Sequence, residues 1–235
     1  IIVIPVYNEN NNIPLLLEKI FALLPENHVM IVDDNSPDGT GETVESLRNK
    51  HPNLLILKRA GKEGLGKAYV AGFKAIMETR GFDSITMMDG DLSHDPRYLP
   101  GMLELAEDYE LVIGSRYIPN GGVTEKWGIR RRFLSFAGNL YLKLIFNRYP
   151  IHDWTTGYNV IKTSALEKIN FDLLSPRGYA FISSLKYYLA KSGATIKETP
   201  IFFEERNGGE SKMSWSIILE GIITPWKIIV RGLFQ

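Results

Sequence analysis

The chain has 235 residues, of which 44% are hydrophobic and 23% charged, and this ordinary globular composition suits one α/β domain or one domain with an appendage. Lys plus Arg and Asp plus Glu both number 27, and the resulting net charge of zero argues against a general nucleic-acid-binding protein. The absence of cysteine excludes disulfides, zinc–thiolate sites and a cysteine nucleophile.

The first half of the chain alternates between short apolar runs and amphipathic segments. Residues 1–5 are apolar throughout, which predicts a strand that is covered on both faces. The same reasoning predicts strands at 28–32, 54–57, 84–88 and 111–114, and helices at 14–24, 41–50, 67–80 and 99–109. This alternation predicts an α/β fold with a doubly wound, mostly parallel sheet and helices on both faces.

The second half is less regular. The pattern predicts an apolar helix at about 130–147, a polar loop at 152–157, a helix at 180–192, a strand at 195–204 and a glycine-containing loop at 206–212. No repeat, low-complexity tract or linker divides the chain. We therefore expect a catalytic domain over residues 1–212 and a C-terminal amphipathic helix over residues 213–235.

An acidic pair follows the apolar segment that ends at Met88. Asp89 and Asp91 flank Gly90, and in an extended segment such alternate residues point to the same side. Both carboxylates could therefore bind one hard cation, with Gly90 leaving room for a ligand against the backbone. Mg²⁺ and Mn²⁺ favour carboxylate and phosphate oxygens, so the pattern suits metal-assisted binding of a nucleotide diphosphate. Acidic pairs also occur in solvated turns.

Polar side chains follow two other predicted strands. Tyr7, Asn8 and Glu9 come after the first strand, and Asp33 and Asp34 after the second. The two aspartates could bind the base and ribose of a nucleotide, because carboxylates accept hydrogen bonds from ring N–H groups and sugar hydroxyls. A run of Asp, Asn, Ser, Pro and Gly is also typical of a turn, and Tyr7 could stack on a base or pack its own loop. Ligands of such sheets bind beyond the carboxyl ends of the strands, so these residues should gather with the acidic pair at one rim.

Several basic or glycine-rich segments carry weaker signals. Arg116, Arg206 and Lys212 could neutralise phosphates near the metal, or could be ordinary surface charges. Residues 61–67 lack the spacing of a P-loop, which argues against hydrolysis of a nucleoside triphosphate there. His94 is expected to be a capping or loop residue and not a catalytic base.

Two apolar helices suit a membrane surface. Residues 130–132 are arginines that precede a long apolar stretch, and residues 216–233 are apolar around most of a helix that contains Trp226. Burial of both helices against the domain is the alternative, and Pro225 is expected to kink the second. The chain starts without a basic, cleavable leader and has no continuous apolar run long enough to span a bilayer, so any membrane-anchoring segments or subunits are expected outside this chain.

Several motifs in register carry a family resemblance. They are Pro5-Val6-Tyr7-Asn8-Glu9, Val32-Asp33-Asp34-Asn35-Ser36-Pro37-Asp38-Gly39-Thr40, Met88-Asp89-Gly90-Asp91-Leu92-Ser93-His94-Asp95-Pro96, Gly114-Ser115-Arg116-Tyr117, Asn120-Gly121-Gly122-Val123, and Arg206 with Gly209-Glu210-Ser211-Lys212. Together they resemble the family 2 glycosyltransferases with the GT-A (Rossmann-like) fold, over nearly the whole chain. The Leu-Ser-His-Asp-Pro form resembles the dolichyl-phosphate mannosyltransferase branch of that family.

The resemblance implies a set of ligands and site residues. The ligands are GDP-mannose, dolichyl (polyprenyl) phosphate, and Mg²⁺ or Mn²⁺ held by Asp91 and Ser93. It implies catalytic roles for Asp91, Arg116 and Arg131, and binding of the lipid phosphate by Arg116, Arg131 and Ser135. The donor contacts that it implies are Pro5, Tyr7, Glu9, Val32, Asp34, Asp89, Gly90, Asp91, Arg116, Arg206 and Lys212.

The expected reaction is metal-dependent transfer of mannose to the lipid phosphate, with inversion at the sugar carbon. We expect it at the cytoplasmic face of a membrane, which would be the endoplasmic reticulum in a eukaryote and the plasma membrane in a prokaryote. The alternatives are a polyprenyl-phosphate glucosyltransferase that uses UDP-glucose, a non-catalytic nucleotide-sugar-binding module, and a soluble transferase that acts on a glycan. A dinucleotide-binding module is disfavoured, because no Gly-x-Gly-x-x-Gly turn follows the first strand.

Overall fold

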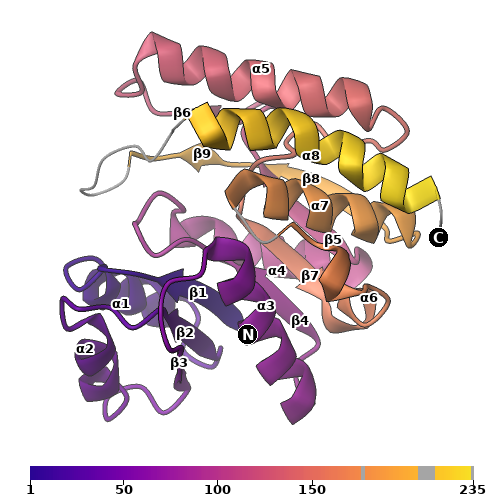
Figure 1. The fold of residues 1–235 in the computed structure, drawn as a ribbon. Helices are drawn as coiled ribbons and strands as arrows, with labels where there is room; N and C mark the ends of the chain where they lie inside the picture. Colours follow the sequence, from indigo (N-terminus) through magenta and orange to yellow (C-terminus); the bar gives the residue numbers. More distant parts are fainter. Residues whose placement is uncertain (176–177, 206–214, 234–235) are drawn as a thin grey trace.

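The computed structural model describes residues 1–175, 178–205 and 215–233 (Figure 1). The strands are β1 (Ile2–Val6), β2 (Val29–Asp33), β3 (Leu54–Lys58), β4 (Ser84–Met87), β5 (Leu111–Ser115), β6 (Gly122–Val123), β7 (Asn159–Lys162), β8 (Ile196–Pro200) and β9 (Phe202–Phe203). The helices are α1 (Ile13–Leu23), α2 (Thr40–Leu47), α3 (Leu65–Thr79), α4 (Leu99–Asp108), α5 (Ile129–Ile145), α6 (Thr163–Leu166), α7 (Gly178–Lys191) and α8 (Trp215–Leu233), with short 3₁₀ turns at Pro96–Tyr98 and Phe171–Leu173.

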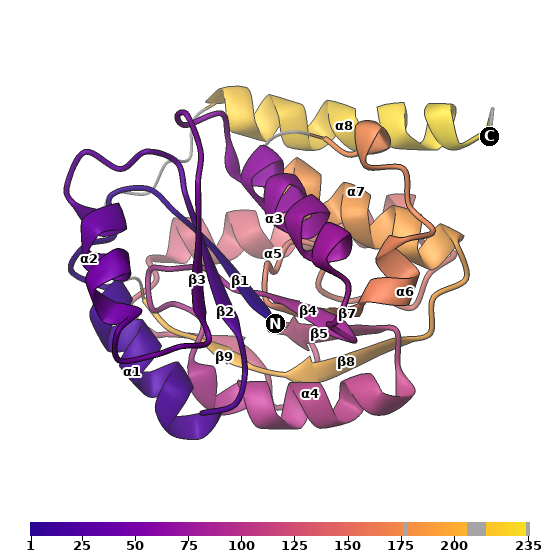
Figure 2. The same ribbon diagram turned by 90° about the horizontal axis from the view of Figure 1, so that it is seen from below.

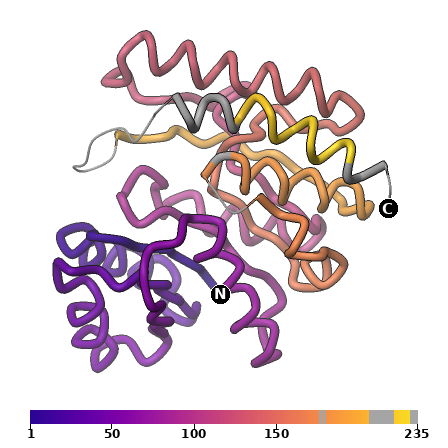
Figure 3. The backbone as a smooth tube through the Cα atoms, in the orientation of Figure 1, coloured from indigo at the N-terminus to yellow at the C-terminus, as the bar shows by residue number. Residues whose placement is uncertain are grey.

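A central sheet sets the position of the candidate site. Its strand order is β3-β2-β1-β4-β7-β5-β8. The chain runs outward from β1 to β3 and then returns to pair β4 with the other side of β1, so β2 and β3 lie to one side of β1 and the later strands of this sheet to the other (Figure 3). The strand order therefore reverses between β1 and β4, and ligands of such sheets bind at this reversal.

Helices cover both faces of the sheet (Figure 2). On one face, α1, α2 and α4 pack through residues such as Leu16, Val44 and Met102 against buried side chains of β1, β2 and β5. On the other face, α3 and α7 pack through residues such as Phe73 and Phe181. The inner strands β1, β2, β4 and β5 are almost entirely buried, as their continuous apolar runs predict, whereas β3 and β8 at the two edges of the sheet are mostly half-buried.

The expected α/β fold with a mostly parallel sheet is confirmed, but details of the prediction in the second half of the chain are wrong. β7 was not predicted, and it lies antiparallel between β4 and β5. The single strand expected over 195–204 is two strands. β8 pairs with β5 and ends at Pro200, whereas β9 pairs with β6 in a separate two-stranded sheet. Between them Ile201 is buried and its N–H donates to the Ser115 carbonyl at 3.0 Å, so the chain changes sheets there.

The two apolar helices lie side by side. Tyr141 of α5 donates to the Ile222 carbonyl of α8 at 2.7 Å, and the Trp226 indole donates to the Tyr141 hydroxyl at 2.9 Å. Figures 1 and 2 place α8 across α7, on the α3 side of the sheet. None of the described helices combines the length and apolarity that crossing a bilayer requires.

Candidate active site

The loops that follow β1, β2 and β4 form the rim of the candidate site. Asn8, Asn35 and Leu92 in these loops have φ angles of 62°, 58° and 63°. In this left-handed region the Cβ of an L-residue crowds the backbone. Asparagine tolerates it because its short polar side chain can form local hydrogen bonds, whereas leucine cannot and rarely adopts it. A strained leucine directly after Asp91 therefore indicates that the backbone of this loop is held in the shape that positions the acidic side chains.

The acidic loop holds Asp91 in one orientation. Its Oδ1 accepts hydrogen bonds from the Ser93 hydroxyl and from the Ser93 N–H, the latter at 3.1 Å. Ser93 is fully buried, so in this arrangement it orients the carboxylate. Gly90 allows close packing, because a Cβ there would lie 3.1 Å from Val6 Cγ1. That side of Gly90 faces β1 and not a ligand, and a donor contact at Gly90 and metal ligation by Ser93 both stay predictions.

His94 packs under the acidic loop, on its buried side. Its ring is almost completely buried, stacks on Tyr158 at a centroid distance of 4.7 Å and accepts a hydrogen bond from the Asp89 N–H through Nδ1 at 3.0 Å. Burial lowers the pKa of His94 to about 3, against the opposing effect of Asp91. The ring is therefore neutral near pH 7 and holds the backbone of Asp89, as expected for a loop residue.

The residues that the sequence predicts to bind the nucleoside lie at the rim beside β2. The Tyr7 ring lies beneath the Lys62 ammonium, 3.9 Å from its centroid, and Glu9 accepts a hydrogen bond from Asn12 at 2.7 Å. Asp34 is buried and forms an ion pair with Arg59. Burial raises the pKa of Asp34, and the charge of Arg59 opposes the rise. Pro5 and Val32 are register partners on β1 and β2 directly before these loops.

Arg116 follows β5 and is held by a buried carboxylate. Its Nε and one terminal nitrogen donate to the two oxygens of Asp153 at 2.8 and 2.9 Å, and the same terminal nitrogen donates to Thr155 at 2.7 Å. Burial would raise the pKa of Asp153, but Arg116 and nearby donors lower it to about 2. The pair is therefore ionised, and Asp153 fixes the direction of the Arg116 side chain.

The loop at 153–157 is itself anchored from two helices. Lys186 of α7 is completely buried and donates to the carbonyls of Asp153 and Thr156 at 2.7 and 3.0 Å. Asn139 of α5 donates to Thr155 at 2.8 Å and accepts from the Trp154 N–H at 2.8 Å. Burial lowers the pKa of Lys186 to about 7, with Asp153 opposing. These contacts tie α5 and α7 to the residues that orient Arg116.

Arg131 and Ser135 lie on α5. The Arg131 guanidinium stacks over the Trp127 ring at 3.7 Å, and Ser135 accepts a hydrogen bond from the Tyr117 hydroxyl at 2.7 Å. Tyr117 directly follows Arg116, so the predicted lipid-phosphate residues belong to adjoining elements. Arg206 and Lys212 lie outside the described residues.

The sequence of this chain matches the family described as glycosyl transferase family 2 over residues 1–169. It is 40% identical to the undecaprenyl-phosphate mannosyltransferase of Micrococcus luteus over 231 residues, which cover 97% of this chain and 94% of that protein. It is 38% identical to the polyprenol monophosphomannose synthase of Mycolicibacterium smegmatis, over 99% of this chain and 87% of that protein. The chain belongs to glycosyltransferase family 2.

Solved structures of glycosyltransferases share the fold of this family 2 member. One is a mannosyltransferase from Pyrobaculum calidifontis in complex with GDP-mannose and Mn²⁺, with a TM-score of 0.66 and 18% identity over 98% of this chain and 63% of that one. Another is glucosyl-3-phosphoglycerate synthase from Mycobacterium tuberculosis, with a TM-score of 0.66 and 14% identity over 98% of this chain and 76% of that one. At this identity the likeness establishes the GT-A fold.

Three charged residues of this glycosyltransferase escaped the prediction from sequence. Arg59, Asp153 and Lys186 are buried or nearly so, and each acts through a partner that lies far away in the chain. A turn-rich segment around Asp153 was visible, but nothing in it indicated Arg116 as the partner. Lys186 lies in the middle of α7 beside apolar and aromatic residues, and a lysine at such a position was the one available signal.

Proposed function

We propose that this chain transfers mannose from GDP-mannose to a polyprenyl phosphate, of which dolichyl phosphate is one form. The observation that carries the proposal is the arrangement of one rim. The acidic loop and the Tyr7–Asp34 side lie at the sheet reversal, and Arg116 and Arg131 lie on the side where α5 and α8 expose apolar residues. The names of the two bacterial relatives, each covered along nearly its full length, support the same reaction.

The acidic loop has the donor set of a Mg²⁺ or Mn²⁺ site. Asp89 and Asp91 supply hard carboxylate oxygens, and the Asp91 carboxylate is oriented by its own loop. Within the described part of the chain no cluster of three His, Cys, Asp or Glu side chains could hold a metal alone. This fits cations that take one or two carboxylates and complete their shell with substrate phosphates. When bound, such a cation stabilises negative charge on the departing nucleoside diphosphate.

Apart from the cation, the reaction needs side chains that bind and orient the two substrates, and it needs no strong base. A phosphate monoester is already anionic near neutral pH, so no residue must remove its proton. His94, buried and neutral, is consistent with this, because it has neither the exposure nor the basicity of a general base. Arg116, fixed by Asp153, and Arg131 would hold the acceptor phosphate in line with the sugar carbon, on the face opposite the leaving group. Inversion follows from that single displacement.

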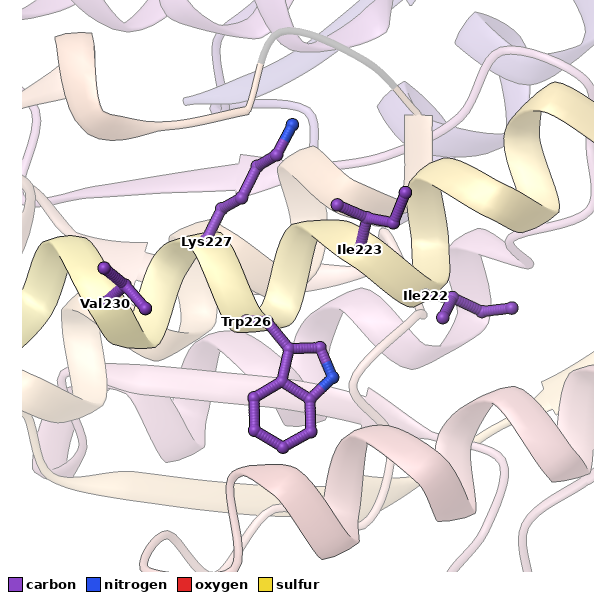
Figure 4. A pocket seen from close by; sticks show the side chains of 5 residues that line it. All are labelled: Ile222, Ile223, Trp226, Lys227 and Val230. Carbon is purple, nitrogen blue, oxygen red and sulfur yellow. The ribbon is translucent and has the colours of Figure 1, made fainter.

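A membrane surface is the place where a polyprenyl phosphate resides, and we place α5 and α8 against it, on the cytoplasmic face. On α5 the apolar side chains Ile129, Phe133 and Leu144 are 85%, 69% and 67% exposed. On α8, Trp226 and Lys227 extend to opposite sides of the helix (Figure 4), and Trp226 is 57% exposed. Exposed apolar and aromatic side chains beside cations are typical of helices that lie in the headgroup layer. Residues 1–212 would then form the catalytic domain, and α8 its membrane-facing addition.

The test is release of GDP from GDP-mannose, with and without a short-chain prenyl phosphate, at varied Mg²⁺ and Mn²⁺. Transfer predicts GDP release that needs both the acceptor and a divalent cation, together with formation of prenyl-phosphate mannose. A binding module would retain the donor without releasing GDP, and a glucosyltransferase would show the same dependence with UDP-glucose instead. Either of these results would overturn the proposal.

A further inference from the structure

The three arginines at the start of α5 have different surroundings. Arg132 donates to the Thr124 carbonyl at 2.9 Å and so anchors the helix to the preceding loop. Arg130 is exposed. Arg131 stacks on Trp127, with its guanidinium carbon 3.7 Å from the ring centroid. Of these three arginines, Arg131 is therefore the one whose guanidinium is held by an aromatic ring.

Trp127 is a buried platform. Its side chain is only 6% exposed, its N–H donates to the Thr124 carbonyl at 3.2 Å, and its ring meets Phe203 edge-on at 5.4 Å. Among the described residues nothing accepts a hydrogen bond from its indole Nε1, which is also buried. A phenylalanine would avoid that unsatisfied donor. The tryptophan is therefore best explained by its large ring face, which binds a cation more strongly than phenylalanine does.

Trp127 is also connected, through Phe203, to Arg116, the other arginine predicted to bind the lipid phosphate. Phe203 of β9 lies between Trp127 and Arg116, whose guanidinium carbon is 5.4 Å from the Phe203 ring centroid. Phe203 also meets the His94 ring edge-on at 5.3 Å. Two touching aromatic rings thus connect Arg131 on α5 with Arg116 beside the acidic loop.

We propose that Trp127 is a positioning residue that presents Arg131 to the phosphate of the lipid acceptor. The proposal rests on the proposed function, because it requires that Arg131 binds that phosphate. Stacking uses the face of a guanidinium, whereas phosphate is bound by the N–H groups in its plane, so both interactions can form at once. An arginine side chain loses conformational entropy when it binds a ligand. A ring that already holds the side chain in place reduces this entropic cost of binding.

The experiment measures the KM for a short prenyl phosphate, the KM for GDP-mannose and kcat. Trp127→Leu is expected to raise the acceptor KM about tenfold, in line with a desolvated cation–π contact, and to leave the donor KM within about twofold. Trp127→Phe, which keeps a smaller ring beneath Arg131, is expected to give an acceptor KM between those of the wild type and Trp127→Leu. Arg131→Ala should raise the acceptor KM at least as much, and adding Trp127→Leu to it should cause little further change.

The matched control is Phe21→Leu, which removes a similarly buried ring from α1 on the opposite face of the sheet. It is expected to lower stability without a selective change in the acceptor KM. Arg131→Lys tests the stack without altering the core, because lysine keeps the charge but not the planar contact. It should behave like Trp127→Leu even if that variant folds poorly.

The outcomes separate the two proposals. If Arg131→Ala left the acceptor KM unchanged, the role of Arg131 in the proposed function would be wrong. If Arg131→Ala raised the acceptor KM while Arg131→Lys did not, the stack would be unimportant and this inference would be overturned. It would also be overturned if Trp127→Leu and Arg131→Ala multiplied as independent changes, or if Trp127→Leu altered both KM values equally.

Discussion

At the residue scale, Asp91 combines a position on the rim with an orientation imposed by Ser93. Asp91→Ala is expected to lower kcat for mannose transfer at least about 100-fold, because charge on the leaving diphosphate would lose its stabilisation. The exposed Asp108→Asn on α4 is the control and should retain activity. Initial rates at saturating Mn²⁺, with circular dichroism to confirm folding, make the comparison. Undiminished metal-dependent turnover in Asp91→Ala would contradict the assigned site.

Lys186 is a second residue whose role can be tested, through the pH dependence of stability. Its buried amine has a pKa of about 7, whereas an unfolded lysine keeps its proton up to about pH 10.4. Between these values the unfolded state binds more protons, so the contribution of Lys186 to stability rises with pH, by at most about 1.4 kcal/mol per unit. Below about pH 7 both states are protonated and the slope vanishes.

The measurement is urea unfolding of the wild type and Lys186→Met at pH 7 and pH 9.5. The free energy of unfolding of the wild type relative to the variant should increase over this interval. Lys74→Met on α3, where the lysine is exposed, should show no such change. An equal difference between wild type and Lys186→Met at both pH values would show that the lysine titrates normally in the native state.

At the scale of elements, α5 has two faces with different tasks. One face carries Asn139 and Leu142, which are buried, and the other exposes Phe133 and Leu144. The double substitution of Phe133→Ser and Leu144→Ser should weaken binding to vesicles of phosphatidylcholine and phosphatidylglycerol about tenfold or more, because two large apolar side chains no longer enter the headgroup layer. Vesicle co-sedimentation gives the bound fraction.

The control for that experiment is Leu15→Ser with Leu23→Ser. These leucines are 41% and 45% exposed, and they lie on α1, on the other face of the sheet. They should leave vesicle binding unchanged. Equal loss in both double variants would mean that vesicles bind exposed apolar residues anywhere on the molecule, and no dedicated membrane face would remain.

At the scale of the whole molecule, donor selectivity is read most directly from thermal stability. A ligand that binds only the native state stabilises it, by about 2.7 kcal/mol at a hundred times its Kd. GDP-mannose with Mn²⁺ should therefore raise the unfolding midpoint by about 5–10 °C for a domain of this size, and UDP-glucose should raise it far less. Differential scanning fluorimetry with each nucleotide sugar is sufficient. A larger shift with UDP-glucose would favour the glucosyltransferase alternative.

The sequence by itself determined the α/β class, the rim with its acidic loop and the family. Strand and helix periods, turn residues and the Asp-Gly-Asp motif are local features, so they can be read from neighbours in the chain. β7 (Asn159–Lys162) was missed because it is short and because only Val160 and Ile161 in it are apolar. Its strand conformation comes from pairing with β4 and β5 on both sides.

Only the tertiary structure decided how the charged residues are paired. Arg116 and Asp153 are 37 positions apart, and Lys186 reaches the Asp153 carbonyl across 33 positions. The stack of Arg131 on Trp127 was equally invisible, although the two are close in the chain, because their contact depends on the turn of chain that starts α5 and on the packing of Phe203. An exposed charged side chain is solvated by water and needs no particular partner. A buried one must pair with another protein group, and which group lies beside it depends on the complete fold.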